Sequence, residues 1–93
     1  MTIEEIRNIV LRFTKKYSIT KIILFGSRAD GTNKKNSDVD LIIEFSVPVS
    51  LITLSQLKIE MEDEMGLEVD IVHGPVSGED MIEIHKEVIL YAA

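Results

Sequence analysis

The sequence predicts an α/β fold of the α+β type, in which a small mixed β-sheet of about three strands is flanked by helices. Two long stretches carry apolar residues at helical spacing, three short stretches are rich in β-branched residues, and glycine or proline separates several of them. The 93 residues, of which 45% are hydrophobic, leave room for one core. We therefore expect a single domain over residues 1–93.

The first expected elements are a helix, a strand and a short helical turn. Thr2 and Glu5 match a capping box, and apolar residues follow at helical spacing, which predicts an amphipathic helix over residues 3–17. Residues 21–25 are short, apolar and followed by glycine, as is typical of a buried strand. One helical turn is expected over residues 27–30.

The remaining elements follow a polar loop. Residues 31–37 are turn-forming and predict an exposed loop, and residues 38–45 predict the second strand. A stripe of leucine and methionine indicates a helix over residues 51–65. The third strand is expected over residues 67–73, and a last helix over residues 78–90.

Composition and charge narrow the class of protein. There is no cysteine and no apolar run long enough to span a bilayer, which favours a cytoplasmic protein and no membrane partner. Residues 1–57 carry eight Lys/Arg and six Asp/Glu, whereas residues 58–93 carry two and ten. The net charge of −6 argues against nucleic-acid binding. The acidic half is interpreted either as ordinary solvated surface or as a face for a basic protein, and self-association stays open for so small a core.

Three aspartates are the candidate metal ligands. Asp38 and Asp40 stand two residues apart at the start of the second strand, so both side chains leave the same face. Asp70 lies between apolar neighbours in the third strand, where a lone carboxylate would be costly to bury. If the two strands are neighbours, the three acids form one cluster. Such a cluster could hold two Mg²⁺ ions and serve an in-line displacement at phosphorus.

The turn after the first strand is a candidate phosphate site. Gly26 lets a ligand approach the backbone closely, and Ser27 offers a hydroxyl at the start of a helical turn whose first amides attract anions. Arg28, Lys34 and Lys35 add positive charge for a phosphate. If the first two strands are antiparallel neighbours, this turn lies beside the first two aspartates.

These residues resemble a known signature. The segment 26–31 followed by the segment 37–41 is similar to the Gly-Ser-x10-Asp-x-Asp motif of the DNA polymerase β-like nucleotidyltransferase superfamily, and at this length to its minimal nucleotidyltransferase (MNT) family. Asp30 departs from the pattern, because many relatives carry a basic or apolar residue there. The resemblance implies a mixed sheet backed by helices, two Mg²⁺ ions bound by three acids, and a nucleotide triphosphate held by the Gly-Ser turn. The matching residues are Asp38, Asp40 and Asp70 for the metals, and Gly26 and Ser27 for the nucleotide.

The same resemblance implies a function and a partner. MNT proteins are commonly paired with a HEPN-domain protein in toxin–antitoxin modules, and characterised examples transfer AMP from ATP to a tyrosine of the HEPN toxin. We therefore expect a Mg-dependent protein adenylyltransferase that acts as an antitoxin, with Asp70 also helping to deprotonate the acceptor hydroxyl. The alternative is a non-catalytic antitoxin that neutralises its partner by binding it. Nucleotide transfer to RNA or to a small molecule is a third hypothesis.

Overall fold

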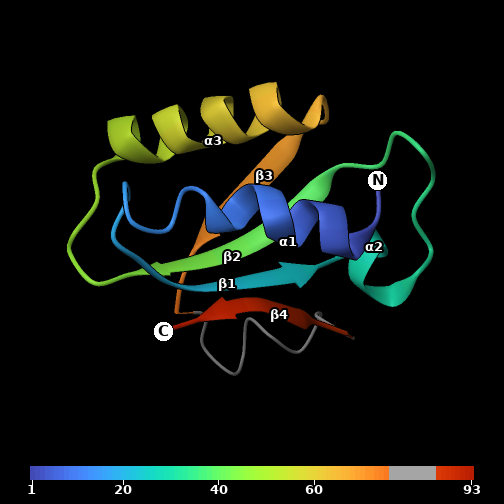
Figure 1. Ribbon diagram of the computed structural model, residues 1–93, viewed down its shortest axis with the longest axis horizontal. Coiled ribbons are helices and arrows are strands. Elements are labelled where there is room, and N and C mark those ends of the chain that lie inside the picture. Colours follow the sequence, from blue (N-terminus) through green and yellow to red (C-terminus); the bar gives the residue numbers. More distant parts are fainter. Residues whose placement is uncertain (76–85) are drawn as a thin grey trace.

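A computed structural model describes residues 1–75 and 86–93, and within them four strands form one mixed sheet beside the helices (Figure 1). The sheet has the order β3-β2-β1-β4. β1 is antiparallel to both of its neighbours, whereas β2 and β3 are parallel. The expected α/β fold with a mixed sheet is confirmed, with four strands where about three were predicted. In chain order the elements are α1 (Ile3–Leu11), β1 (Ile19–Phe25), α2 (Ser27–Asp30), β2 (Val39–Phe45), α3 (Leu51–Met65), β3 (Val69–His73) and β4 (Val88–Ala92).

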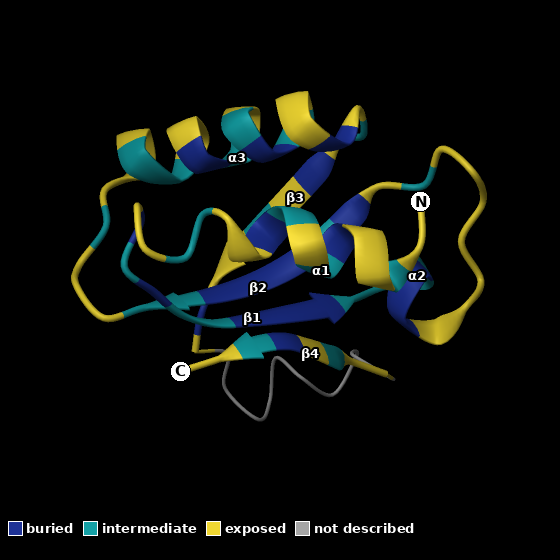
Figure 2. Cartoon of the chain, viewed as in Figure 1, coloured by how far each residue is buried: buried dark blue, intermediate teal, exposed yellow. Residues whose placement is uncertain are grey.

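The sheet has one face toward the helices and one face away from them. Alternate residues of a strand point to opposite faces, and one alternating set from the strands packs with α1 and α3 into a single apolar core. Figure 2 shows the buried side of α3 turned toward the sheet and its outer side exposed. The completely buried side chains of this core include Ile6 and Val10 from α1, Leu41 and Ile43 from β2, and Leu57 and Met61 from α3.

The first helix is shorter than predicted, because α1 ends at Leu11 and not at residue 17. The amides of residues 12–14 bond to carbonyls three residues earlier, which is the tighter pattern that often ends a regular helix. Ser18, with φ of 54°, then turns the chain toward β1. Tyr17 still reaches the core and is 6% exposed. The apolar spacing therefore identified the buried residues correctly but overestimated the length of the helix.

The helix predicted over residues 78–90 is wrong at its end, because residues 88–92 form strand β4. β4 pairs with β1, so its backbone groups find partners in the sheet, and Leu90 joins the core. Residues 76–85, which hold most of the predicted helix, lie outside the described residues.

The three predicted strands and the helices over residues 27–30 and 51–65 are confirmed, with small shifts at the ends of the strands. α2 and α3 have the predicted bounds, and Gly66 ends α3 in a left-handed conformation. β1 begins two residues earlier than predicted, at Ile19, whereas β2 and β3 begin slightly later, at Val39 and Val69. No helix within residues 1–75 and 86–93 is long and apolar enough to cross a membrane.

A buried tyrosine ties the turn after α1 to α3. The Tyr17 hydroxyl donates to the carboxylate of Glu60, which also accepts from Lys16 Nζ at 2.6 Å. Burial, together with this bond, raises the pKa of Tyr17 from 10.0 to about 12. A pKa that is higher in the folded state stabilises the fold fully below the unfolded value, and that contribution is lost as the pH rises through the folded value. The window for the loss is therefore pH 10 to 12.

We expect Tyr17→Phe to lower the melting temperature by a few degrees at neutral pH, because the hydroxyl and its bond to Glu60 are lost. The gap between the wild type and the variant should narrow between pH 10 and 12 when both are melted under circular dichroism. Tyr91→Phe is the matched control, since the Tyr91 hydroxyl makes no hydrogen bond to a described residue. A gap that stays constant up to pH 12 would contradict this account of Tyr17.

Candidate active site

Asp40 and Asp70 occupy paired positions on neighbouring strands. β2 and β3 run parallel, with Val39 paired to Val69 and Asp40 paired to Asp70. Because both valines are completely buried in the core that contains the helices, both aspartates belong to the opposite face of the sheet. The second and third strands are thus neighbours, which was the condition for bringing Asp70 close to Asp40. Burial, followed by the charges of Asp70 and Asp38, raises the pKa of Asp40.

Asp38 lies just before β2 and is exposed. It is close enough for its charge to act on Asp40. Within the described part of the chain, however, no three acidic or histidine side chains are gathered into a group that could hold a metal ion. Carboxylates repel one another when no cation lies between them. The three aspartates offer only carboxylate oxygens as ligand atoms, and these are the ligands that hard divalent cations such as Mg²⁺ prefer.

Gly26 brings the end of β1 against Asp40. Phe25, the last residue of β1, is paired with Asp40 across the antiparallel ladder. Gly26 follows with φ of 74° and ψ of −158°, a backbone conformation that is essentially restricted to glycine. A Cβ atom at this position would overlap Oδ2 of Asp40. The Gly-Ser turn and the carboxylate are therefore in direct contact. The first two strands are antiparallel neighbours, which was the condition for placing the turn beside the aspartates.

Ser27 begins α2 immediately after this glycine. The amides of Ala29 and Asp30 bond to the Gly26 carbonyl at 3.1 and 3.2 Å, and no side chain caps the start of the helix. The first amides of a helix have no partner within the helix itself. The half-buried Ser27 thus begins a turn with amide donors, directly after the glycine that contacts Asp40.

Arg28 points into the protein and is 3% exposed. Its guanidinium donates to the carbonyl of Ser37 from Nε at 3.0 Å and from Nη2 at 2.8 Å, and it also reaches the carbonyls of Lys35 and Met1, each at 3.2 Å. These bonds hold the loop that leads into Asp38. Sequence reasoning assigned Arg28 to phosphate and missed this contact with the loop, because carbonyl partners leave no residue pattern.

The loop after α2 carries the other charges expected near a phosphate. Lys34 and Lys35 are exposed in this loop. Asp30, the departure from the family pattern, accepts from the amide of Thr32 at 3.0 Å and from its hydroxyl at 2.6 Å. The extra acid therefore helps to shape the turn that ends α2.

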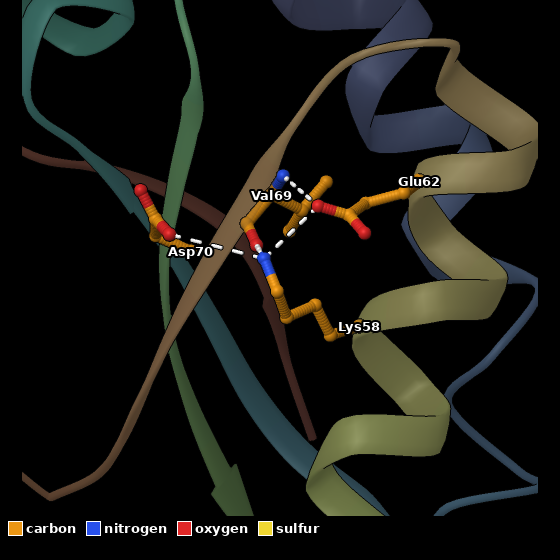
Figure 3. A network of polar contacts seen from close by, with 4 residues as sticks. All are labelled: Lys58, Glu62, Val69 and Asp70. Carbon is orange, nitrogen blue, oxygen red and sulfur yellow. Dashed lines mark hydrogen bonds and ion pairs between the residues drawn. The ribbon is translucent and has the colours of Figure 1, made fainter.

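Sequence reasoning also missed Lys58. Its Nζ atom lies 3.9 Å from Oδ1 of Asp70 and bonds to Oε2 of Glu62 and to the carbonyl of Val69 (Figure 3). The glutamate lies four residues further along α3, at the spacing of a common helical ion pair, which is the only signal that the sequence carried.

A Gly-Ser turn at the end of one strand, set against an Asp-x-Asp segment that opens its neighbour, defines a nucleotidyltransferase site. A family model described as "Nucleotidyltransferase domain" matches residues 3–90. The chain therefore belongs to the nucleotidyltransferase family and is a nucleotidyltransferase enzyme.

Relatives with curated names point to one branch of this family. The protein adenylyltransferase MntA of Thermococcus cleftensis is 34% identical over 76 residues, which cover 77% of each chain. A protein of Methanocaldococcus jannaschii, named as a candidate protein adenylyltransferase, is 36% identical over 72 residues, again 77% of each chain.

Solved structures share the fold. A candidate minimal nucleotidyltransferase matches with a TM-score of 0.73 and 27% identity over 95% of both chains. A toxin–antitoxin complex with AMP-PNP gives a TM-score of 0.77 at 20% identity, covering 94% of this chain and 73% of that one. A complex of the tri-AMPylated HEPN toxin of Shewanella oneidensis with its MNT antitoxin gives 0.73 at 15% identity, covering 97% and 72%. At these last two identities the likeness is one of fold.

We expect Gly26→Ala to destabilise the protein more than Gly66→Ala. Gly66 is left-handed, with φ of 68° and ψ of 22°, so a methyl group there costs about 1–2 kcal/mol of backbone strain. Gly26, with φ of 74° and ψ of −158°, has a conformation that is essentially restricted to glycine, so its backbone strain is at least as large. Only at Gly26 does the added methyl also collide with Asp40, since nothing lies within 4 Å of a Cβ at Gly66. Urea unfolding of the two variants measures the difference. Equal losses of unfolding free energy would contradict the contact between the turn and Asp40.

Proposed function

We propose that this protein transfers AMP from ATP to a tyrosine hydroxyl of a HEPN-family toxin and so acts as the antitoxin of that toxin. The observation that carries the proposal is the register of β2 and β3, with Asp40 paired to Asp70 and the Gly26 turn against Asp40. Relatives named protein adenylyltransferases support the reaction. Fold neighbours seen in complexes with HEPN toxins, one of them AMPylated, support the acceptor.

The proposed reaction is a displacement at the α-phosphorus of ATP. The tyrosine oxygen forms a bond to that phosphorus, the bond to the bridging oxygen of the β-phosphate breaks, and pyrophosphate leaves. Asp38, Asp40 and Asp70 would hold two Mg²⁺ ions, which when bound neutralise charge on the attacking and leaving oxygens. Asp70 also accepts the proton of the attacking hydroxyl. Burial, followed by the charges of Asp70 and Asp38, raises the pKa of Asp40, and a bound cation would stabilise its charged form.

The triphosphate would lie along the Gly-Ser turn. The missing side chain of Gly26 lets the Asp40 carboxylate lie directly against the turn. The Ser27 hydroxyl and the first amides of α2 would donate to the β- and γ-phosphates. Arg28 contributes positive charge and holds the loop before Asp38. The phosphates and the carboxylates then share one end of the β1–β2 ladder, as transfer from a metal-bound nucleotide requires.

A second candidate function is neutralisation of the toxin by binding alone. Residues 58–93 carry ten acidic and two basic side chains, which suits contact with a basic protein surface. The two functions differ in one observable quantity, the mass of the toxin after incubation with Mg-ATP. A tight complex with an unmodified toxin would favour neutralisation by binding.

We expect Asp40→Asn to reduce AMP transfer at least about 100-fold while the protein stays folded, because a proposed metal ligand loses its charge. Mass spectrometry of the HEPN partner after incubation with Mg-ATP counts the added AMP groups. Glu44→Gln is the matched control, since it removes a carboxylate from the same strand at a position paired with Lys21. Undiminished transfer by Asp40→Asn would contradict the assignment of the site.

A further inference from the structure

Strand β3 lies at an edge of the sheet among the described residues and has only β2 as a neighbour. The Val39 amide bonds to the Glu68 carbonyl at 2.9 Å, so the pairing with β2 uses the backbone groups on either side of Val69. In a parallel pair the amide and carbonyl of the intervening residue point the other way. The backbone groups of Val69 therefore face the open edge, where they would otherwise depend on water.

Two side chains of α3 take the place of the missing strand at this edge. Oε2 of Glu62 accepts from the Val69 amide at 2.9 Å, and Nζ of Lys58 donates to the Val69 carbonyl at 2.5 Å (Figure 3). The two side chains also bond to each other at 2.9 Å. The Val69 amide, and then Lys58, lower the pKa of Glu62, which keeps its carboxylate ionised. We call this pair, Lys58 and Glu62, the edge clamp.

The edge clamp extends to the candidate site. α3 packs on the face of the sheet that contains the core, whereas Asp70 belongs to the opposite face. The Lys58 side chain reaches from α3 past the edge of β3, and its Nζ atom lies 3.9 Å from Oδ1 of Asp70. Asp70 is paired with Asp40, and like charges at paired positions repel. Lys58 is thus the cation that faces Asp70 from the side away from Asp40.

We propose that Lys58 is a positioning residue for nucleotidyl transfer, which with Glu62 clamps the edge of β3 so that the Asp70 carboxylate stays beside Asp40. The inference rests on the proposed function, because the carboxylate that is held is the proposed metal ligand. Without the ammonium group, the Val69 carbonyl loses its partner, so the backbone that carries Asp70 is held less firmly. The pair Asp40 and Asp70 also loses a nearby positive charge that compensates their negative charge. The carboxylate would then turn toward solvent, which it already meets with 52% of its side chain exposed.

The test compares Lys58→Met with Lys16→Met. Both changes remove an ammonium that is paired with a glutamate of α3, but Lys16 bonds to Glu60 and makes no hydrogen bond or ion pair with the described residues of β3. Electron paramagnetic resonance gives the affinity for Mn²⁺ without nucleotide, and amide exchange by NMR reports on Val69. We expect Lys58→Met to weaken Mn²⁺ binding about 10-fold, to speed exchange at Val69 and to lower kcat for AMP transfer with little change in the KM for ATP. Lys58→Arg should restore most of the affinity.

The outcomes separate this inference from the function on which it rests. Equal Mn²⁺ affinity in Lys58→Met and Lys16→Met, or tighter binding by Lys58→Met, would overturn the positioning role while leaving the proposed function intact. A wild-type protein that neither binds Mn²⁺ nor transfers AMP would overturn the function and the inference together. If Lys58→Met fails to fold, Lys58→Gln carries the same comparison, and an unchanged Mn²⁺ affinity there would overturn the role.

Discussion

The in-register pairing of β2 with β3 is the constraint on which the candidate site depends. Val39 and Val69 are completely buried at paired positions, and Asp40 and Asp70 follow them on the other face. A slip of one residue would move Asp70 into the apolar core and Val69 to the opposite face. Burying an unpaired carboxylate costs far more than the core could tolerate. The packing of the core therefore also fixes which carboxylates meet on the other face.

This arrangement holds like charges together at some cost to the fold. The pKa of Asp40 is raised by burial and by the charges of Asp70 and Asp38, so the folded protein would gain stability from a cation at this place. Lys58 supplies positive charge from one side of Asp70. On the other side of the pair, the Asp40 carboxylate occupies the place where any residue other than Gly26 would put a Cβ atom. The side chains proposed to bind the metal are thus the same ones whose mutual repulsion lowers the stability of the fold.

Much of this could be predicted from the sequence, because alternation and spacing encode it. Three strands, the long helix α3 and the Gly-Ser and Asp-x-Asp segments were all found. The structure meets both conditions set for the site, since the first two strands are antiparallel neighbours and the third lies beside the second. The parallel direction of that second pair was not predicted. Strand β4 was missed, since its apolar run is equally compatible with the end of a helix until the edge of β1 is known. The bonds of Arg28 to the loop before Asp38, and the role of Lys58, were overlooked for a different reason. Both side chains donate to backbone carbonyls that tertiary structure brings within reach, and such partners leave no residue pattern.

The most direct measurement of the central claim is a crystal structure of the protein with Mn²⁺ and a non-hydrolysable ATP analogue, with the metal located by anomalous scattering. We expect an anomalous peak bonded to oxygens of both Asp40 and Asp70, with the phosphates of the analogue along the turn at Gly26. A peak bound only by phosphates and water, or a Mn²⁺ ion that leaves Asp70 unliganded, would contradict the claim that the register of β2 and β3 builds the catalytic centre.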